Sequence, residues 1–187
     1  MGQTLSELGQ AAVADLGAVL AAIPDDAADP LIEAILSSRR IAIHGLGREG
    51  LAMKGFAMRL FHMGRDVHVV GDMTTPPLGP GDLLIVSAGP GDFRSIDALL
   101  DIASNAGART AVVTAEPQGA TSQKADILLA IPAQTMANDR GGAVSVLPMG
   151  SLFEFAEAIV FELIILKLRE RTGETAETMR ARHTNLE

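Results

Sequence analysis

The chain has 187 residues, of which 48% are hydrophobic and 20% are charged. These proportions suit one compact globular domain and exclude a disordered or fibrous chain. The formal net charge is −8, and the chain contains six Phe but no Trp or Tyr. An acidic chain with no run of Lys or Arg and few rings for stacking is a poor partner for nucleic acid or an anionic membrane.

The chain lacks cysteine, which excludes disulfides, thiolate chemistry and cysteine-based metal sites. Its first residues show neither the basic start nor the apolar stretch of a signal peptide. The longest apolar segment, residues 151–168, contains Glu154, Glu157, Glu162 and Lys167, so we expect no membrane span. The sequence therefore predicts a cytoplasmic protein.

Two helices are predicted before residue 40. The first covers residues 4–22, because Thr4 and Glu7 have the spacing of a capping box and apolar residues then recur at helical intervals. Pro24 ends it. The second runs from about Pro30 to Ser38, with its proline in the first turn, where the missing N–H is tolerated.

Residues 40–131 form the predicted α/β core, in which short aliphatic runs alternate with helical patterns. The predicted strands are 41–44, 67–70, 83–86, 110–114 and 127–131, and the predicted helices are 51–63, 94–105 and about 120–124. Strands that are apolar throughout are typical of a parallel sheet covered on both faces. We predict one domain over residues 1–187, with a doubly wound, flavodoxin-like α/β fold and a five-stranded parallel sheet flanked by helices.

The last part of the chain contains a long loop and a long helix. Residues 132–150 show no periodicity and are too long for a simple connector, which makes them a candidate active-site loop. A helix is predicted over about 151–171 and ends at Gly173. A polar tail follows, with the cationic cluster Arg180-x-Arg182-His183.

Two glycine-rich turns follow the first and third predicted strands. The first, Gly45-x-Gly47-x-x-Gly50, has the spacing of a dinucleotide-binding turn, with Asp72 beyond the second strand, so NAD-dependent redox chemistry is one hypothesis. A tight turn between strand and helix also requires glycines, whatever the ligand. The second turn contains Gly89-Pro90-Gly91, and two such turns favour a small ligand held from both sides by backbone amides.

Glu154 is the most informative acidic residue. On a helical wheel its neighbours are Ala158, Phe161 and Ile165, and a carboxylate among apolar groups should have a raised pKa and could transfer a proton near neutral pH. Ser151 and Glu154 also have the spacing of a capping box, which requires no catalysis. The spacing alone leaves both interpretations open.

The four histidines differ in what they suggest. His183 lies in the polar tail, where it is either a solvated surface residue or part of a cationic cluster for an anionic substrate or a subunit contact. His44, His62 and His68 have no metal-ligand spacing on one helix face, and we interpret them as structural.

Five segments carry a resemblance to a known family: Gly45-Leu46-Gly47-Arg48-x-Gly50-Leu51, Phe56-Ala57-Met58-Arg59-Leu60-x-His62-x-Gly64, Thr74-Thr75-Pro76, Pro148-Met149-Gly150-x-Leu152-Phe153-Glu154 and Met179-Arg180-Ala181-Arg182-His183-x-Asn185-Leu186-Glu187. Together they resemble the sugar isomerase (SIS) domain family, most closely its 6-phospho-3-hexuloisomerase group. The resemblance covers nearly the whole chain and displaces the redox hypothesis.

The resemblance implies an isomerase that moves a carbonyl between adjacent carbons of a phosphosugar through a cis-enediolate, as between 3-hexulose 6-phosphate and fructose 6-phosphate. It implies that Glu154 is the general base and His183 a second acid or base. It also implies a homotetramer or homodimer with shared sites, in which the tail reaches a neighbouring subunit, and no cofactor or metal. A SIS domain that only binds a sugar is the alternative.

The chain departs from the pattern of this family in both glycine-rich turns. The resemblance implies Ser at position 49 and a Ser-Gly-Ser-Gly-Glu-Thr run where this chain has residues 88–93, so hydroxyls for a phosphate are missing and Glu49 adds a carboxylate. Arg48 and Arg94 could bind a phosphate instead, and Ser87 and Ser95 could supply hydroxyls at shifted positions. Otherwise the sugar differs or carries no phosphate. The expected substrate-binding residues are Gly45, Gly47, Arg48, Glu49, Ser87, Gly89, Gly91, Asp92 and Arg94.

Overall fold

The computed structural model describes residues 2–140 and 144–186. Residues 141–143 of the predicted active-site loop lie outside the described residues, as do residues 1 and 187 at the ends of the predicted domain. The first half of the chain contains α1 (Leu5–Ala21), α2 (Asp29–Ser37), β1 (Ile41–His44), α3 (Gly47–His62), β2 (Val67–Val69) and β3 (Leu83–Ser87). The second half contains α4 (Arg94–Asn105), β4 (Arg109–Thr114), the 3₁₀ helix η1 (Ser122–Lys124), β5 (Ile127–Ala130), α5 (Ser151–Thr172) and α6 (Ala176–Arg180).

The five strands form one parallel sheet in the order β2-β1-β3-β4-β5. The predicted doubly wound, five-stranded α/β fold is therefore confirmed. Every residue of β3 is buried, and β4 is buried after its first residue, as expected for strands covered by helices on both faces.

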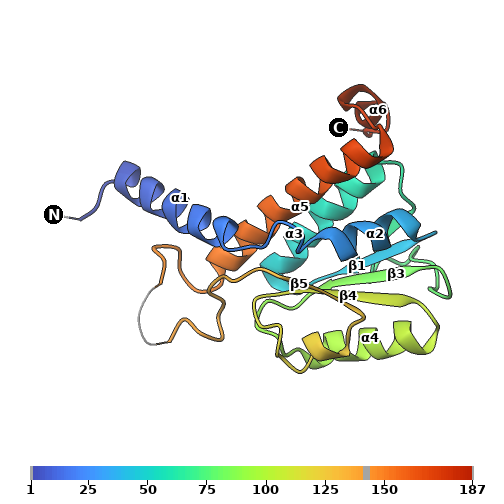
Figure 1. The fold of residues 1–187 in the computed structure, drawn as a ribbon, viewed down its shortest axis with the longest axis horizontal. Coiled ribbons are helices and arrows are strands. Elements are labelled where there is room, and N and C mark those ends of the chain that lie inside the picture. Colours follow the sequence, from blue (N-terminus) through green and yellow to red (C-terminus); the bar gives the residue numbers. More distant parts are fainter. Residues whose placement is uncertain (1, 141–143, 187) are drawn as a thin grey trace.

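Helices form a layer on each face of the sheet (Figure 1). α1, α2, α3 and α5 contribute to the larger apolar core on one face, whereas α4 packs on the other. α3 and α5 pack against each other along their lengths, and both begin at the edge of the sheet where the parallel strands end. Their first turns are therefore placed together over the carboxyl ends of the strands.

Three local features differ from the sequence prediction. α3 begins at Gly47 rather than near Leu51, so Arg48 and Glu49 lie in its first turn and not in a loop. The polar tail, for which no helix was predicted, contains α6, which Thr175 caps through Thr178 and which Met179 anchors in the core. The short helix expected at about 120–124 is one 3₁₀ turn.

The described part of residues 132–150 contains neither helix nor strand, as predicted. α1 holds this loop through Asp15, whose carboxylate accepts hydrogen bonds from the Ser145 hydroxyl at 2.6 Å and the Val146 amide at 3.0 Å. The capping box of α1 forms as expected between Thr4 and Glu7. α1 thus supports the loop that borders the carboxyl ends of the strands (Figure 1).

Within the described residues, every helix is too short or too polar to cross a lipid bilayer.

Candidate functional site

The candidate site lies where the strand order reverses, between β1 and β3. In a doubly wound sheet the connections from these two strands leave toward opposite faces, which opens a crevice at their carboxyl ends. A pocket of about 630 Å³ occupies this position. Its walls come from the turn after β1, the turn after β3, the loop 132–150 and the start of α5, and they include Leu46, Gly47, Arg48, Glu49, Pro90, Phe93, Thr135, Met136, Pro148, Met149, Phe153 and Glu154.

Arg48 and Glu154 form an ion pair in this pocket, with Nη2 of Arg48 2.7 Å from Oε2 of Glu154. The Glu154 side chain is 17% exposed and the Arg48 side chain 52% exposed. The pair joins the first turn of α3 to the first turn of α5. A carboxylate at the pocket wall with a guanidinium beside it can accept a proton from a ligand and stabilise negative charge that develops on the ligand.

The capping-box interpretation of Ser151 and Glu154 is wrong. Gly150 is the N-cap of α5, and no side chain caps this end of the helix. Ser151 is already the first helical residue, so its hydroxyl cannot take the N-cap role, and the Glu154 carboxylate extends toward Arg48 instead. Met149, next to the cap, has φ of 56°, a left-handed conformation that is uncommon for a side chain of this kind and is found at binding sites.

Glu49 lies between the two glycine turns. Its Oε2 accepts hydrogen bonds from the Ser87 hydroxyl at 2.7 Å and the Gly89 amide at 3.0 Å. The residue is 8% exposed and lines the pocket. Burial raises the pKa of the Glu49 carboxyl, while these two hydrogen bonds oppose that shift.

Glu157 is a buried acidic residue that sequence reasoning missed as a site residue. It is completely buried one helical turn after Glu154, and burial raises its pKa well above the ordinary value, with the charges of Glu49 and Glu154 acting in the same direction. Glu157 is therefore the more deeply buried of these two carboxyls, since the Glu154 side chain is 17% exposed at the pocket wall. Both glutamates lie on the same hydrophobic helix, so the helix sequence does not separate their roles. Their neighbours do: Glu154 pairs with Arg48 of α3, whereas Glu157 lies beside Ser87 of β3.

The glycines of the two turns differ in what surrounds them and in why a side chain is excluded. Gly47 lines the pocket with φ of 55°. A Cβ on Gly50 would overlap the Gly45 carbonyl, so these two glycines allow the end of β1 to approach α3. Gly91 packs against Glu116 and Gly119, away from the pocket. Gly89 lies against Phe153 and Glu49.

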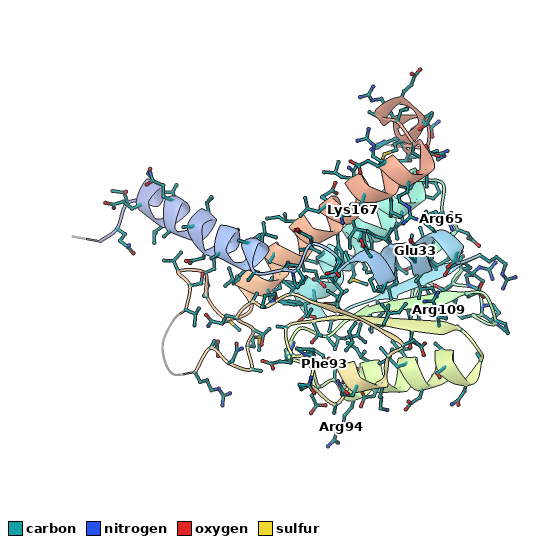
Figure 2. All side chains as sticks on the ribbon, in the orientation of Figure 1. Glu33, Arg65, Phe93, Arg94, Arg109 and Lys167 are labelled. Carbon is teal, nitrogen blue, oxygen red and sulfur yellow. The ribbon has the colours of Figure 1, made fainter. Side chains whose placement is uncertain are left out.

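The structure does not bring Asp92 or Arg94 to the pocket. Both are exposed, and neither lines the pocket walls. Figure 2 shows the Arg94 side chain directed away from the sheet at the start of α4. Within the described pocket walls, Arg48 is the single cationic residue, beside the carboxylates of Glu49 and Glu154.

His183 lies at the opposite end of α5 from Glu154. The helix between Glu154 and its end at Thr172 spans about 27 Å at 1.5 Å per residue. The His183 ring stacks on His62, at the end of α3, with ring centroids 5.1 Å apart. Within one chain the structure therefore separates the two residues expected to share the chemistry.

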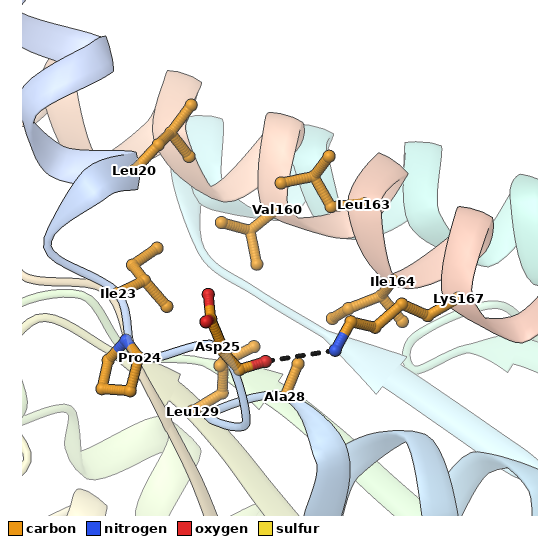
Figure 3. Close-up of a pocket in the computed structure, with 10 residues that line it drawn as sticks. All are labelled: Leu20, Ile23, Pro24, Asp25, Ala28, Leu129, Val160, Leu163, Ile164 and Lys167. Atoms are coloured by element: carbon orange, nitrogen blue, oxygen red, sulfur yellow. Dashed lines mark hydrogen bonds between the residues drawn. The ribbon is translucent and has the colours of Figure 1, made fainter.

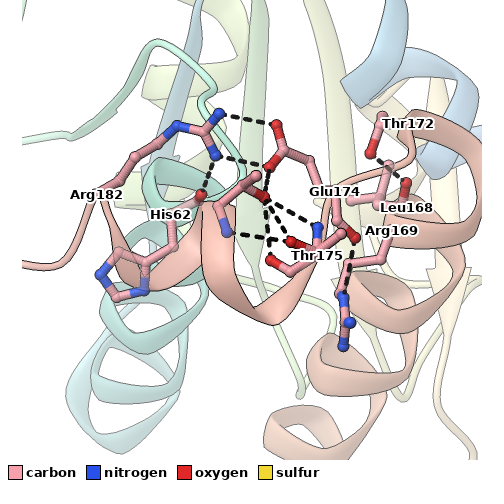
Figure 4. Close-up of polar contacts among 8 residues, drawn as sticks. His62, Leu168, Arg169, Thr172, Glu174, Thr175 and Arg182 are labelled. Carbon is pink, nitrogen blue, oxygen red and sulfur yellow. Dashed lines mark hydrogen bonds and ion pairs between the residues drawn. The ribbon is translucent and has the colours of Figure 1, made fainter.

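The tail that carries His183 is held by Arg182. Its guanidinium donates to both oxygens of Glu174 at 2.8 and 2.9 Å and to the His62 carbonyl at 2.8 Å (Figure 4). Arg182, with a hydrogen bond from Thr178, holds the pKa of Glu174 down to about 2. The cationic cluster of the tail is thus partly neutralised within the chain.

A second pocket, of about 200 Å³, lies between α1, α2 and α5 (Figure 3). Its walls are mainly apolar, and the Lys167 ammonium donates to the Asp25 carbonyl at 3.1 Å. This pocket offers no carboxylate–guanidinium pair comparable to that of Glu154. Across the described ranges, no three His, Asp or Glu side chains are placed to hold a metal ion.

A doubly wound sheet with a small-molecule pocket at its switch point, equipped with a carboxylate and a guanidinium, defines an α/β protein suited to proton transfer on a small polar ligand. The family model of the SIS domain matches residues 34–156. The chain belongs to the SIS domain family, and the resemblance inferred from the five sequence segments is confirmed.

Two sequence relatives carry the same name, and a solved structure has the same fold. A 3-hexulose-6-phosphate isomerase of Bacillus subtilis (strain 168) is 40% identical over 165 residues, which are 88% of this chain and 89% of the relative. One of Mycobacterium gastri is 39% identical over 84% of this chain and 78% of the relative. The crystal structure of a Methanococcus jannaschii protein, inferred to be a 3-hexulose-6-phosphate isomerase, matches with a TM-score of 0.82 and 28% identity, covering 98% of this chain and all of that one.

Proposed function

We propose that the protein is a sugar isomerase that interconverts ketoses of the 3-hexulose 6-phosphate and fructose 6-phosphate type. The observation that carries this proposal is the Glu154 carboxylate at the pocket wall, 2.7 Å from the Arg48 guanidinium. Close relatives named 3-hexulose-6-phosphate isomerase support the choice of substrate class. The proposal requires no cofactor and no metal.

In the proposed reaction, Glu154 removes the proton from the hydroxyl-bearing carbon next to the carbonyl. The electron pair of that C–H bond forms a carbon–carbon double bond, and the carbonyl oxygen becomes the oxygen of a cis-enediolate. Glu154 then returns the proton to the former carbonyl carbon, while a hydroxyl proton moves between the two oxygens. Arg48 offers N–H donors near the developing oxyanion, where a preorganised cation lowers the barrier.

The proposal is tested by solvent exchange. With fructose 6-phosphate in deuterium oxide, the wild-type protein should incorporate deuterium at the carbon next to the carbonyl, which NMR detects. Glu154→Gln keeps the shape of the side chain but removes the base, so exchange and turnover should fall at least about a thousandfold. Glu162→Gln is the matched control, because Glu162 lies on the same helix and pairs with Arg59 outside the pocket.

Near-normal exchange in Glu154→Gln would contradict the assignment of the base. Binding of the sugar phosphate without any exchange in the wild-type protein would instead favour a SIS domain that only binds sugars. One observation favours that second function: Glu49 occupies the space between the glycine turns, where a phosphate could otherwise be held.

We also propose that the active form is a cytoplasmic homo-oligomer, a homotetramer or homodimer, in which His183 acts in the pocket of a neighbouring subunit. The length of α5 keeps His183 away from Glu154 of its own chain. Analytical ultracentrifugation measures the assembly. If sites are shared, mixing the inactive Glu154→Gln and His183→Gln variants should restore part of the activity, whereas sites within one chain would give no recovery.

A further inference from the structure

The pocket contains a carboxylate at the position best suited to bind an anion. The Gly89 amide donates to Glu49 at 3.0 Å, and α3 begins at Gly47 with no side chain capping its first turn, where a helix N-terminus favours negative charge. The Glu49 carboxylate, in the first turn of α3, fills the space between the two glycine turns. A Cβ on Gly89 would lie 2.9 Å from Glu49 Oε1, so the side chain fits closely against the second turn.

The two oxygens of Glu49 have different surroundings. Oε2 accepts both hydrogen bonds, from Ser87 and Gly89. Among the contacts of the described residues, none is a hydrogen bond to Oε1, and Glu49 is one of the residues that line the pocket. Oε1 can therefore accept a hydrogen bond from a donor on the ligand.

The charges around this position oppose a second anion. Glu157, completely buried beside Ser87 and Glu49, keeps its proton because burial raises its pKa, so it adds no charge that could balance an anion. Glu154 also lies close enough for its charge to act on Glu49. Arg48, the cation of the pocket wall, is already paired with Glu154. A phosphate dianion beside Glu49 would be repelled and would have to displace its hydrogen bonds.

We propose that Glu49 is a specificity-determining residue: its carboxylate is the resident anion between the glycine turns, and it selects a sugar that presents a hydroxyl there. The phosphate of a phosphorylated substrate is then directed away from the glycine turns, toward the open side of the pocket where Arg48 is half exposed. This inference rests on the proposed function for the identity of the ligand, but the occupation of the anion site does not require catalysis.

The test is an NMR titration of the full chain with inorganic phosphate, with the Gly89 amide as the reporter. In the wild-type protein this amide should not respond, because Glu49 already accepts its hydrogen bond. Glu49→Ala and Glu49→Ser empty the site and should bind phosphate at least about tenfold more tightly, with a saturable shift at Gly89. Glu49→Gln removes the charge but keeps the volume and an acceptor oxygen for the Gly89 amide, so its gain in phosphate affinity should be clearly smaller than that of Glu49→Ala and Glu49→Ser.

Three results would overturn the proposal: a Gly89 response to phosphate in the wild-type protein, no gain in Glu49→Ala and Glu49→Ser when their spectra are those of folded protein, or an equal gain in Glu49→Gln. The control is Glu162→Ala, which removes the same charge from an exposed site and should behave as wild type.

The solvent-exchange assay separates this inference from the proposed function. In Glu49→Gln, the KM for the sugar should rise severalfold with little change in kcat, because a charged acceptor for a sugar hydroxyl is lost while Glu154 is retained. A fall in kcat alone would contradict the specificity role. If the wild-type protein shows no exchange with any sugar phosphate but the titrations behave as expected, the proposed catalysis fails and the resident anion stands.

Discussion

The guanidinium of Arg48 lies 2.7 Å from the carboxylate of Glu154, and the pair joins the first turns of α3 and α5 at the wall of the pocket. Because α3 follows the first strand in the chain, β1, and α5 follows the last strand, β5, two residues 106 positions apart meet at one point. The pair fixes the direction of the carboxylate that we propose as the base. It also keeps that carboxylate from capping its own helix.

Replacing Arg48 by Met should misplace Glu154 and remove a cation from beside the developing oxyanion. We expect kcat/KM to fall about a hundredfold, the size of effect expected from a misplaced catalytic group. Steady-state kinetics on the isomerisation measures it. Arg59→Met is the matched control, since Arg59 joins α3 to α5 through Glu162, outside the pocket. An equal loss in both variants would mean that the Arg48 pair serves only helix packing.

Gly89→Ala should destabilise the protein and disturb Glu49. A Cβ at this position would lie 2.8 Å from the Phe153 ring and 2.9 Å from Glu49 Oε1, with little room for either to move. Overpacking of this kind costs about 1–3 kcal/mol, which a urea-unfolding curve detects. Gly55→Ala, in α3, meets no atom within 4 Å and should instead stabilise by about 0.5–1 kcal/mol. Unchanged stability in Gly89→Ala would contradict the close fit.

Glu157→Gln should change how stability depends on pH. Burial raises the pKa of Glu157 well above its ordinary 4.5, so the folded protein keeps the proton at pH values where the unfolded chain has lost it. The unfolded state then binds fewer protons, and this group lowers the free energy of unfolding as the pH rises above 4.5, by at most about 1.4 kcal/mol per pH unit.

The Gln side chain does not titrate, so it cannot contribute to this fall in the free energy of unfolding with rising pH. The stability of Glu157→Gln relative to wild type should therefore increase steadily as the pH is raised from 4.5, until the pKa of the folded protein is passed. Urea midpoints over a pH series measure the difference between the two proteins. A difference independent of pH would show that Glu157 is ionised in the folded protein.

Arg182→Met should release the tail that carries His183. The variant loses the hydrogen bonds to Glu174 and to the His62 carbonyl, so the amides of residues 176–184 should exchange with deuterium faster, with little effect on the core. Lowering the pH should also release the tail, because it weakens the pairing of Arg182 with Glu174. The pKa of Glu174 is lowered to about 2, so its contribution is complete above its ordinary pKa of 4.5 and is lost as the pH falls toward 2.

Arg180→Met is the control for the tail. Arg180 is an exposed residue at the end of α6, and its replacement removes the same charge two positions away. Equal exchange rates in the two variants would show that the overall charge of the tail, and not the contacts of Arg182, holds it in place.

The strands of the sheet could be predicted from the sequence because each one is marked by a short run of neighbouring residues. Uninterrupted aliphatic runs such as Leu83–Val86 indicate buried parallel strands, and Gly173 correctly ended the long helix, which it caps with φ of 73°. The start of α3 was placed four residues late. A glycine-rich stretch lacks helical periodicity in its side chains, whereas the backbone of Gly47 begins the helix directly after the turn.

The sequence by itself determined the doubly wound fold and the two glycine turns, because chain-local patterns of hydrophobicity and spacing encode them. The spacing left the role of Glu154 open, and the family resemblance implied that it is the base. Only the tertiary structure decided that Glu154 pairs with Arg48, that Glu157 is the buried carboxyl and that Glu49 fills the space beside Gly89. It also decided that Asp92 and Arg94 lie away from the pocket and His183 at the far end of α5. These relationships depend on how separate strands and helices meet, and a side chain's charge state and partners follow from neighbours that are distant in the chain.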